Sequence, residues 1–372
     1  MRSLASEARE CAPSKRELAP KAHACAPSKR ELAPKAHVLV RTPSWLGDFV
    51  ACEPVLRALS ATWREHGAAS RLTFAGPAAL LEMLGKSCAD VQLVPVARGA
   101  DPDVRAWRGH DVALLLDGSW RSAWAAWRAH IPERVGWAGG GRTPLLTLAP
   151  RPALERGATP LGLGIHGRGA RRLPRPFASA CVELAALAGL EVRERAPRLA
   201  VDARALERVH ERLRARGIDP TRPFVLVNAG ARTGSAKAAE PALLARLARG
   251  AALPIVLACG PGEEANARAT SALLGDLSAI LLDDPPPSLI ELTALISACA
   301  VCITADSGPR HIAQALEKRT IVVCGPTDPR HTAEHAENVT VLRAEVPCGP
   351  CHREVCPNVG ENERLCMRSI VV

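Results

Sequence analysis

The chain has 372 residues, of which 47% are hydrophobic and 23% charged, the composition of a globular protein long enough for two domains. Aromatic residues make up only 3% and tyrosine is absent, which argues against a base-stacking platform for nucleic acid. The net charge of +10 fits an acidic substrate or an anionic membrane surface as well as nucleic acid. No run of about 18 uncharged apolar residues occurs, so no transmembrane helix is predicted.

The first segment is a duplicated leader. Residues 11–24 recur as 25–38 with one difference, and each copy carries two prolines and little apolar content. Two copies are too few for a solenoid, so residues 1–36 are predicted to be a disordered leader. Residues 1–37 hold eight basic and four acidic side chains, so this segment supplies +4 of the net charge of +10.

The leader has no apolar core of the kind that a secretory signal needs, and we therefore expect a cytoplasmic protein. In that reducing compartment most cysteines stay thiols, and those in apolar segments are expected to be small buried residues. Cys299 and Cys302 in "CAVC" are interpreted in this way rather than as a redox pair.

Strands and helices alternate from His37 onward. Apolar strand segments are "HVLVR", "SRLTFAG", "VQLVPV" and "DVALLLDG", and the helical segments between and after them are "EPVLRALSATWREHG", "PAALLEMLGK" and "SWRSAWAAWRAH". This alternation predicts parallel βαβ units and an α/β domain over residues 37–176.

A stretch rich in Gly, Pro and Arg over 150–176 interrupts the pattern. It contains "GLGIHG", in which Gly162, Gly164 and Gly167 have the dinucleotide-binding spacing. That motif requires a preceding strand and a following helix, and neither is predicted here. A basic loop is the preferred interpretation.

A second series follows, with helices near 177–189 and 202–217. Its strand segments are "RPFVLVNAG", "LPIVLACG", "SAILLDD", "AVCITADSG", "RTIVVCG" and "NVTVLRA". The sequence thus predicts two doubly wound domains that face a cleft, the second over 177–346, and a cysteine-rich tail over 347–372. Ligands of such sheets bind beyond the carboxyl ends of the strands.

The loop "ADSGPRH" follows one of these strands and opens a helix. Asp306 or Ser307 can cap the helix, and Pro309 suits its first turn. Gly308 would let an anion approach the free backbone N–H groups, which favour phosphate. His311 could orient the loop or contact the phosphate. A capped helix without a ligand is the alternative.

Three further strand ends carry polar residues. Thr327 follows the next strand, Lys237 lies in the loop "NAGARTGSAK", and Glu263 and Glu264 lie in "CGPGEEANAR". A cation suits a diphosphate, and a carboxylate can bind ribose hydroxyls. Since strand ends of one parallel sheet meet at one edge, these residues predict a nucleotide-diphosphate site.

Asp48 occupies the first strand-to-helix turn of the first domain, in "PSWLGDFV". A carboxylate at this position can cap a helix or accept a proton from an acceptor hydroxyl, as a general base does. Because the pKa of an ordinary Asp is about 3.9, Asp48 would be ionised at neutral pH.

Six ordered segments resemble the lipopolysaccharide heptosyltransferases of glycosyltransferase family 9, most of all the heptosyltransferase II type. The segments are "RTPSWLGDFVACEPVLRAL", "GSWRSAWAAWRAHIPERVGWAGGGRTPLLT", "NAGARTGSAK", "ADSGPRHIAQAL", "VVCGPTDPRHT" and "CGPCHREVCP…LCMRSI". The resemblance implies a GT-B fold, with an acceptor-binding first domain and a nucleotide-sugar-binding second domain. It also implies inverting, metal-independent transfer of heptose from ADP-heptose to the lipopolysaccharide inner core on lipid A, at the inner face of the cytoplasmic membrane.

Carried over by position, the resemblance makes Asp48 the catalytic base and Lys237 a contact to the diphosphate. Asp306, Ser307, Gly308 and His311 match the donor loop, and Glu264, or Glu263 by a one-residue shift, matches the ribose-binding acid. Arg121, Arg134 and Arg142 are candidates for the acidic groups of the acceptor, because guanidinium groups bind phosphate and carboxylate in bidentate fashion. No cofactor is needed for catalysis.

Other functions stay open at this point. They are transfer of another nucleotide-activated sugar, a basic zinc-knuckle protein that binds nucleic acid, and a nicotinamide-dependent oxidoreductase. The dispersed basic residues and the two predicted sheets disfavour the second, and the misplaced glycine motif disfavours the third.

The tail spaces Cys348, Cys351, Cys356 and Cys366 as C-x2-C-x4-C-x9-C. Four thiolates in this spacing are compatible with a tetrahedral structural zinc site. Two disulfides or four free thiols are the alternatives. We expect the tail to be a structural clasp distant from the donor loop and from Asp48.

Overall fold

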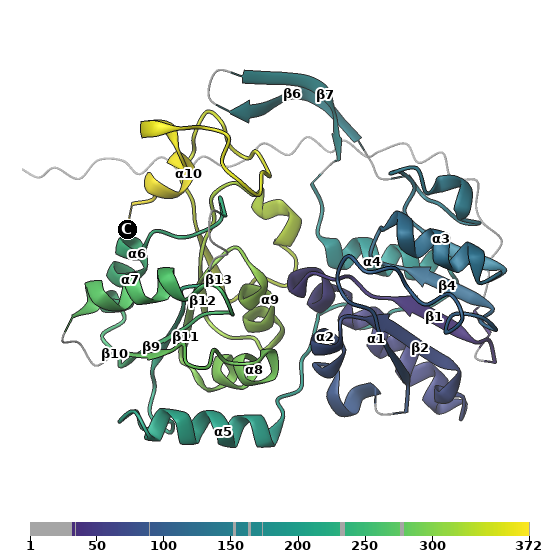
Figure 1. Cartoon of the computed structure of the whole chain (residues 1–372), viewed down its shortest axis with the longest axis horizontal. Helices are drawn as coiled ribbons and strands as arrows, with labels where there is room; N and C mark the ends of the chain where they lie inside the picture. Colours follow the sequence, from purple (N-terminus) through teal and green to yellow (C-terminus); the bar gives the residue numbers. More distant parts are fainter. Residues whose placement is uncertain are drawn as a thin grey trace, which may run out of the picture. The chain divides into compact units, whose positions relative to one another are not determined.

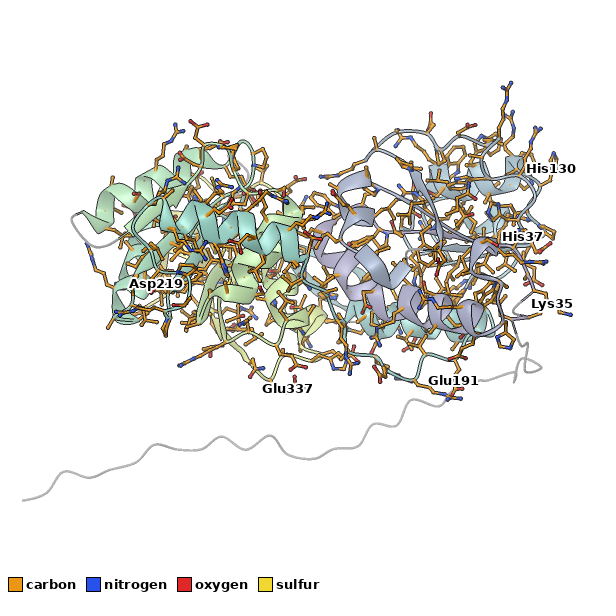
Figure 2. The ribbon with its side chains drawn as sticks, turned by 90° about the horizontal axis from the view of Figure 1, so that it is seen from below. Lys35, His37, His130, Glu191, Asp219 and Glu337 are labelled. Atoms are coloured by element: carbon orange, nitrogen blue, oxygen red, sulfur yellow. The ribbon has the colours of Figure 1, made fainter. Side chains whose placement is uncertain are left out.

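The computed structural model describes residues 32–33, 35–88, 90–151, 154–162, 165–172, 174–230, 235–275 and 279–371. Most of the predicted leader therefore lies outside the described residues. Its last part contacts the body of the protein: the Lys35 carbonyl accepts a hydrogen bond from Arg71, and the Ala36 carbonyl accepts one from the Trp63 indole. The Lys35 and His37 side chains lie at the surface (Figure 2).

The first sheet has five parallel strands in the order β3-β2-β1-β4-β5. Its strands are β1 (Val38–Arg41), β2 (Leu72–Gly76), β3 (Gln92–Pro95), β4 (Val112–Leu115) and β5 (Glu133–Gly136). The helices of this part are α1 (Leu46–Glu65), α2 (Ala78–Glu82) and α3 (Trp120–Arg128), with short 3-10 turns η1 (Ala69–Arg71), η2 (Gly85–Cys88) and η3 (Thr143–Leu145) (Figure 1). The four strands predicted here are confirmed, whereas β5 was not predicted.

Both faces of this sheet are covered, as the burial of β1 shows. Val38 and Val40 pack in one apolar cluster with residues of α1, while Leu39 between them packs in another with residues of α3. Successive side chains of a strand point to opposite faces, so a strand buried on both faces reads as a continuous apolar run. That is why these strands were predictable.

The second sheet has six parallel strands in the order β10-β9-β8-β11-β12-β13, and all six were predicted. The strands are β8 (Val225–Asn228), β9 (Ile255–Ala258), β10 (Ala279–Leu282), β11 (Val301–Ala305), β12 (Thr320–Val323) and β13 (Val339–Leu342). The helices are α5 (Ala203–Arg214), α6 (Pro241–Gly250), α7 (Glu264–Leu274), α8 (Leu289–Ala298) and α9 (Gly308–Ala315), followed by the 3-10 turn η4 (Pro329–Thr332).

The stretch predicted as a loop is a two-stranded antiparallel sheet, β6 (Leu154–Gly162) and β7 (Ile165–Arg172) (Figure 1). The expectation of a loop was wrong because Gly, Pro and Arg mask the strand pattern. Gly162 and Gly167 belong to the two strands of this hairpin. A dinucleotide loop needs a helix after the motif, so the hairpin removes the support for a nicotinamide site.

The helix α4 (Phe177–Leu187) follows the hairpin and packs along α1 of the first sheet. One cluster of buried side chains runs from α1 and α4 to α8 and α9, and so joins the layers around both sheets. Beyond β13 the tail forms the 3-10 turn η5 (Gly360–Asn362) and the short helix α10 (Leu365–Arg368). Among the described helices, none is long and apolar enough to span a bilayer.

Candidate active site

The strand order of the two sheets predicts where a ligand would bind. In the first sheet the order reverses between β1 and β4, and in the second between β8 and β11. In open parallel sheets, ligands bind outside the carboxyl ends of the strands at such a reversal. The segments that directly follow these four strands contain Asp48, Asp117, Lys237 and Asp306.

Asp48 lies in the first turn of α1 and is half-buried. Burial raises the pKa of this carboxyl above its ordinary value, and the positive charge of Lys237 lowers it in part. Lys237 follows β8 of the second sheet, so its charge acts on Asp48 from the half of the protein built around the second sheet, while Asp48 belongs to the half built around the first. A desolvated carboxylate of raised pKa is a stronger proton acceptor than one in water.

The loop between β1 and α1 is held by Arg41, which the sequence did not single out. Its guanidinium donates to the Thr42 carbonyl (2.7 Å), to the Ala75 carbonyl (3.2 Å) and to the Ser44 hydroxyl (3.2 Å). Its Nε lies 3.6 Å from the buried Asp117 carboxylate, which follows β4. This network ties together the loops at the reversal point of the first sheet and so positions the start of α1.

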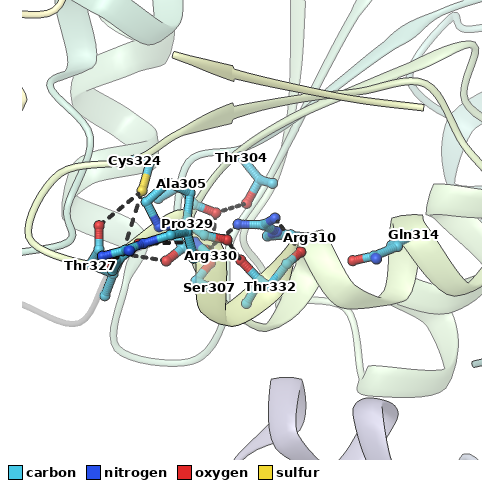
Figure 3. Close-up of polar contacts among 12 residues, drawn as sticks. Thr304, Ala305, Ser307, Arg310, Gln314, Cys324, Thr327, Pro329, Arg330 and Thr332 are labelled. Atoms are coloured by element: carbon cyan, nitrogen blue, oxygen red, sulfur yellow. Dashed lines mark hydrogen bonds and ion pairs between the residues drawn. The ribbon is translucent and has the colours of Figure 1, made fainter. Parts of the chain in front are cut away.

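Asp306 is buried in a second polar network, whose members Arg310, Thr327 and Thr332 are labelled in Figure 3. Its carboxylate accepts hydrogen bonds from the Arg310 guanidinium (2.6 Å) and from the Thr327 hydroxyl. Arg310 is fully buried and also donates to the Thr332 carbonyl at 3.0 Å. Burial alone would raise the pKa of Asp306, but Arg310, Thr327 and Lys237 together outweigh it and hold that pKa below its ordinary value. Asp306 is thus a fixed anion.

The start of α9 differs from the predicted capping. Ser307 is the N-cap residue, but its side chain makes no capping bond and instead its hydroxyl donates to the Ala305 carbonyl at 3.4 Å. Asp306 directs its carboxylate to Arg310 and Thr327. Ser307 thus holds the expected N-cap position without the expected side-chain bond, and the N–H groups of the first turn of α9 receive no bond from the Ser307 side chain.

Two glycines, one from each half, allow α1 and α9 to approach. A Cβ added to Gly308 would lie 2.4 Å from Leu46 Cδ2, and one added to Gly47 would lie 2.6 Å from His311 Cδ2. The space beside Gly308 is thus filled by Leu46, whereas the sequence suggested that it serves the approach of an anion. Side chains at either glycine would force the two helix starts apart.

His311 is half-buried at this contact. Burial, assisted by the charge of Arg310, lowers the pKa of His311 to about 4, so the imidazole is neutral at pH 7. Lys237 acts electrostatically on Asp48, Asp306 and His311 alike. Three predicted site residues are therefore grouped near the charge of a fourth, Lys237.

The two glutamates of the β9 loop have different surroundings. The Glu263 carboxylate accepts from the Gly260 N–H at 3.0 Å and covers Gly230, so it lies between the ends of β8 and β9, and burial raises its pKa. Glu264 accepts from the Gly262 N–H at 2.9 Å, and this bond lowers its pKa. Glu263 is the one that faces the neighbouring strand end.

The three candidate acceptor arginines have separate environments. Arg121 is exposed on α3 and pairs with Asp101 at 3.1 Å. Arg134 donates to the carbonyls of Leu145 (2.6 Å) and Ile131 (2.5 Å). Arg142 is buried, donates to the Trp137 carbonyl at 2.8 Å, and lies beside Gly118 at the end of β4.

The tail contacts the segments next to Lys237 and Thr327 directly, which the sequence did not predict. The Ala236 N–H donates to the Glu354 carbonyl (2.8 Å), and the His352 N–H donates to the Pro326 carbonyl (2.8 Å). Arg364 bonds the Ala238 carbonyl and pairs with Glu240 at 3.1 Å. The tail therefore braces the segment 236–240 that carries Lys237.

The four tail cysteines line one small cavity together with Ala236 and Pro326. The cysteines described by the structure are free thiols. Burial and the three neighbouring thiols raise the pKa of Cys366 to about 11, and the Arg364 N–H donates to Cys356 Sγ at 3.2 Å. Within the described part of the chain, no three His, Cys, Asp or Glu side chains are grouped as metal ligands.

Comparison with known proteins places this geometry in a family. The family model "Glycosyltransferase family 9 (heptosyltransferase)" matches residues 173–360, about half of the chain. The chain belongs to glycosyltransferase family 9. Lipopolysaccharide heptosyltransferase 2 of Salmonella typhimurium is 26% identical over 331 residues, which cover 82% of this chain and 87% of that protein.

Solved structures agree with the family 9 assignment. A family 9 glycosyl transferase from Veillonella parvula superposes with a TM-score of 0.66 at 18% identity, covering 84% of this chain and 87% of that one. Escherichia coli ADP-heptose lps heptosyltransferase II superposes with a TM-score of 0.61 at 25% identity, covering 84% and 92%. These superpositions confirm the predicted GT-B fold, and the family membership confirms the predicted glycosyltransferase activity.

For this family 9 enzyme, the site residues near Lys237 were predicted from the sequence, whereas Arg310, Arg41 and Asp117 were not. One signal was available for Arg310, because Asp306 and Arg310 are four residues apart, the spacing of a helical ion pair. No comparable signal joins Arg41 to Asp117, which are 76 positions apart and meet only because β1 and β4 are neighbours.

Proposed function

We propose that this glycosyltransferase moves heptose from ADP-heptose to the inner core of a lipopolysaccharide acceptor on lipid A, with inversion at the anomeric carbon and with Asp48 as the general base. The observation that carries the proposal is the close packing of the start of α1, which holds Asp48, against the start of α9, and the action of the Lys237 charge on Asp48 supports it. This packing brings a proton acceptor of the first half near a cation of the second half.

The reaction is a single displacement. Asp48 takes the proton of the acceptor hydroxyl, whose oxygen forms a bond to the anomeric carbon while the bond to ADP breaks. Lys237 and the N–H groups at the start of α9 stabilise the charge that develops on the departing ADP. Attack opposite the leaving group inverts the anomeric configuration.

The other residues proposed for the site have different surroundings and therefore different roles. The Asp306–Arg310–Thr327 network sets the shape of the loop before α9 and holds a negative charge near Lys237. Glu263, between the ends of β8 and β9, is the ribose-binding acid in this scheme. Arg142, which lies beside Gly118 in the loop after β4, is the acceptor-side arginine in this scheme.

Asp48→Asn, with the exposed Asp90→Asn as control, tests the base. We expect transfer from ADP-heptose to fall about 10²–10⁴-fold, the usual contribution of a general base, while ADP-heptose still protects the variant against thermal unfolding. Transfer near the wild-type rate would remove Asp48 from this role. A panel of nucleotide sugars tests the donor: protection by another nucleotide sugar, and none by ADP-heptose, would replace heptose by that sugar.

Cys348, Cys351, Cys356 and Cys366 are proposed to hold one structural zinc, because their kind and number suit a tetrahedral thiolate site and they share one cavity. Zinc would draw the thiols together and stiffen the brace on segment 236–240; it takes no part in the transfer step. Metal analysis of the purified chain should find one zinc per chain. Chelation should lower the melting temperature of the wild type, but not that of a Cys356→Ser variant. Protein without zinc, or a melting temperature indifferent to chelator, would contradict the site.

A further inference from the structure

The exposed face of α3 consists of tryptophan and arginine alone. Trp120, Trp124 and Trp127 are 46%, 37% and 44% exposed, and Arg121 and Arg128 are also exposed. The other side of the helix carries Ser122, Ala123, Ala125 and Ala126, which are buried. Solvated helix faces usually carry Lys and Glu, and grouped exposed apolar side chains mark an interaction site. We call these five exposed residues the Trp–Arg face.

The three indoles form a continuous stack. The ring centroids of Trp120 and Trp124 are 5.2 Å apart and those of Trp124 and Trp127 4.9 Å, with interplanar angles of 15° and 27°. Positions 120, 124 and 127 share one side of a helix, which places the rings in line. Trp124 has a ring on each side, so both of its faces are covered and it offers no open platform for a sugar ring or a base.

All charged side chains of α3 are positive. No carboxylate occurs on α3, whereas Arg121 lies in its first turn and Arg128 is its last residue. Asp101 pairs with Arg121, but both side chains are more than half exposed, and such a pair exchanges readily with other ions. The exposed His130 follows the helix and lies at the edge of the molecule (Figure 2). Indole edges beside guanidinium groups suit the interface of an anionic bilayer.

The face also lies beside the acceptor side of the site. α3 begins directly after the β4 loop that carries Asp117, and the Trp120 ring is in contact distance (3.8 Å) of the position that a Cβ on Gly141 would take, next to Arg142. We infer that the Trp–Arg face docks on the anionic phospholipid surface of the membrane that holds the acceptor. This inference rests on the proposed function, since a lipid-anchored acceptor is what makes such docking useful.

Vesicle flotation tests the docking without the reaction. The wild type should float with vesicles of phosphatidylcholine and phosphatidylglycerol, and only weakly with phosphatidylcholine alone. Trp120→Ser/Trp124→Ser/Trp127→Ser should lose vesicle binding at least tenfold, and Arg121→Glu/Arg128→Glu should lose the preference for anionic vesicles. Arg204→Glu/Arg216→Glu, the same charge change at exposed arginines of the second half, is the matched control.

Several outcomes would overturn the inference. They are absence of wild-type binding to anionic vesicles, binding by the Trp triple variant equal to wild type, and equal losses in the arginine control. A dimer in vesicle-free solution that the Trp variant abolishes would assign the face to a second copy of the chain instead. Thermal protection by ADP-heptose is measured on every variant. If protection persists while vesicle binding is absent, the docking inference fails and the proposed function stands; if the wild type is not protected, the proposed function fails.

Discussion

Two aspartates stand at comparable places in the two halves, each in the loop or first turn between a strand and a helix at the reversal point of its sheet. Asp48 is desolvated, and its pKa is raised in spite of Lys237. Asp306 is buried more deeply, yet its pKa is lowered, because Arg310 and Thr327 bond its carboxylate. The difference shows that the partners of a carboxylate, rather than its position in the fold, decide whether it can accept a proton or only holds charge.

The largest expected effect follows from the opposite pKa shifts. A carboxyl whose folded pKa is lowered stabilises the fold at neutral pH, and one whose folded pKa is raised destabilises it. Asp306→Asn should therefore lower the free energy of unfolding, by about 3–5 kcal/mol because it leaves the buried Arg310 unpaired. Asp48→Asn should raise it. Urea unfolding at pH 7 measures both free energies, with the exposed Asp90→Asn as control. If both substitutions change the free energy of unfolding in the same direction, the contrast between the two aspartates is contradicted.

A smaller effect is expected where the two halves touch. Gly308→Ala should cost about 1–3 kcal/mol, the usual effect of overpacking, and should reduce transfer, because the new Cβ meets Leu46. Removing the obstacle in Gly308→Ala/Leu46→Ala should restore transfer relative to the single variant. Gly250→Ala, at a position with open space around it, should leave unfolding and transfer near wild type. If the double variant shows no recovery, Gly308 serves the approach of a ligand rather than that of Leu46.

The smallest effect sharpens the electrostatic link between the halves. Lys237 lowers the pKa of Asp48, so Lys237→Met should move the acid limb of kcat to higher pH, since the base then protonates more readily. Lys237→Arg keeps the charge and should leave the limb in place. The profile is measured at saturating donor, so that weaker donor binding does not enter. An acid limb unmoved in the Met variant would show that Lys237 does not act on the base.

The sequence predicted most of the fold because parallel strands buried on both faces are continuous apolar runs. It missed β5, whose four residues Glu133–Gly136 include two charged side chains, and β6–β7, whose Gly, Pro and Arg content hides the alternation. Both regions were missed for the same reason. Whether such a segment forms a strand depends on pairing with a neighbouring strand and not on its local sequence pattern.

Site residues were predictable one loop at a time. Asp48, Lys237 and Asp306 each follow a predicted strand, and the family resemblance assigned their roles. Their mutual arrangement was not predictable, because it depends on how α1 meets α9. The contact of the tail with segment 236–240 was missed for the same reason, since it joins residues more than 100 positions apart.

The paired glycines have a consequence for exchanging parts between family members. Each glycine leaves room for a side chain of the other half: Gly47 packs against His311, and Gly308 packs against Leu46. A chimera that takes its first half from one enzyme and its second half from another must therefore transplant "WLGD" and "SGPRH" as a matched set. Chimeras that take these two segments from different enzymes should have halves that fold but do not pack against each other.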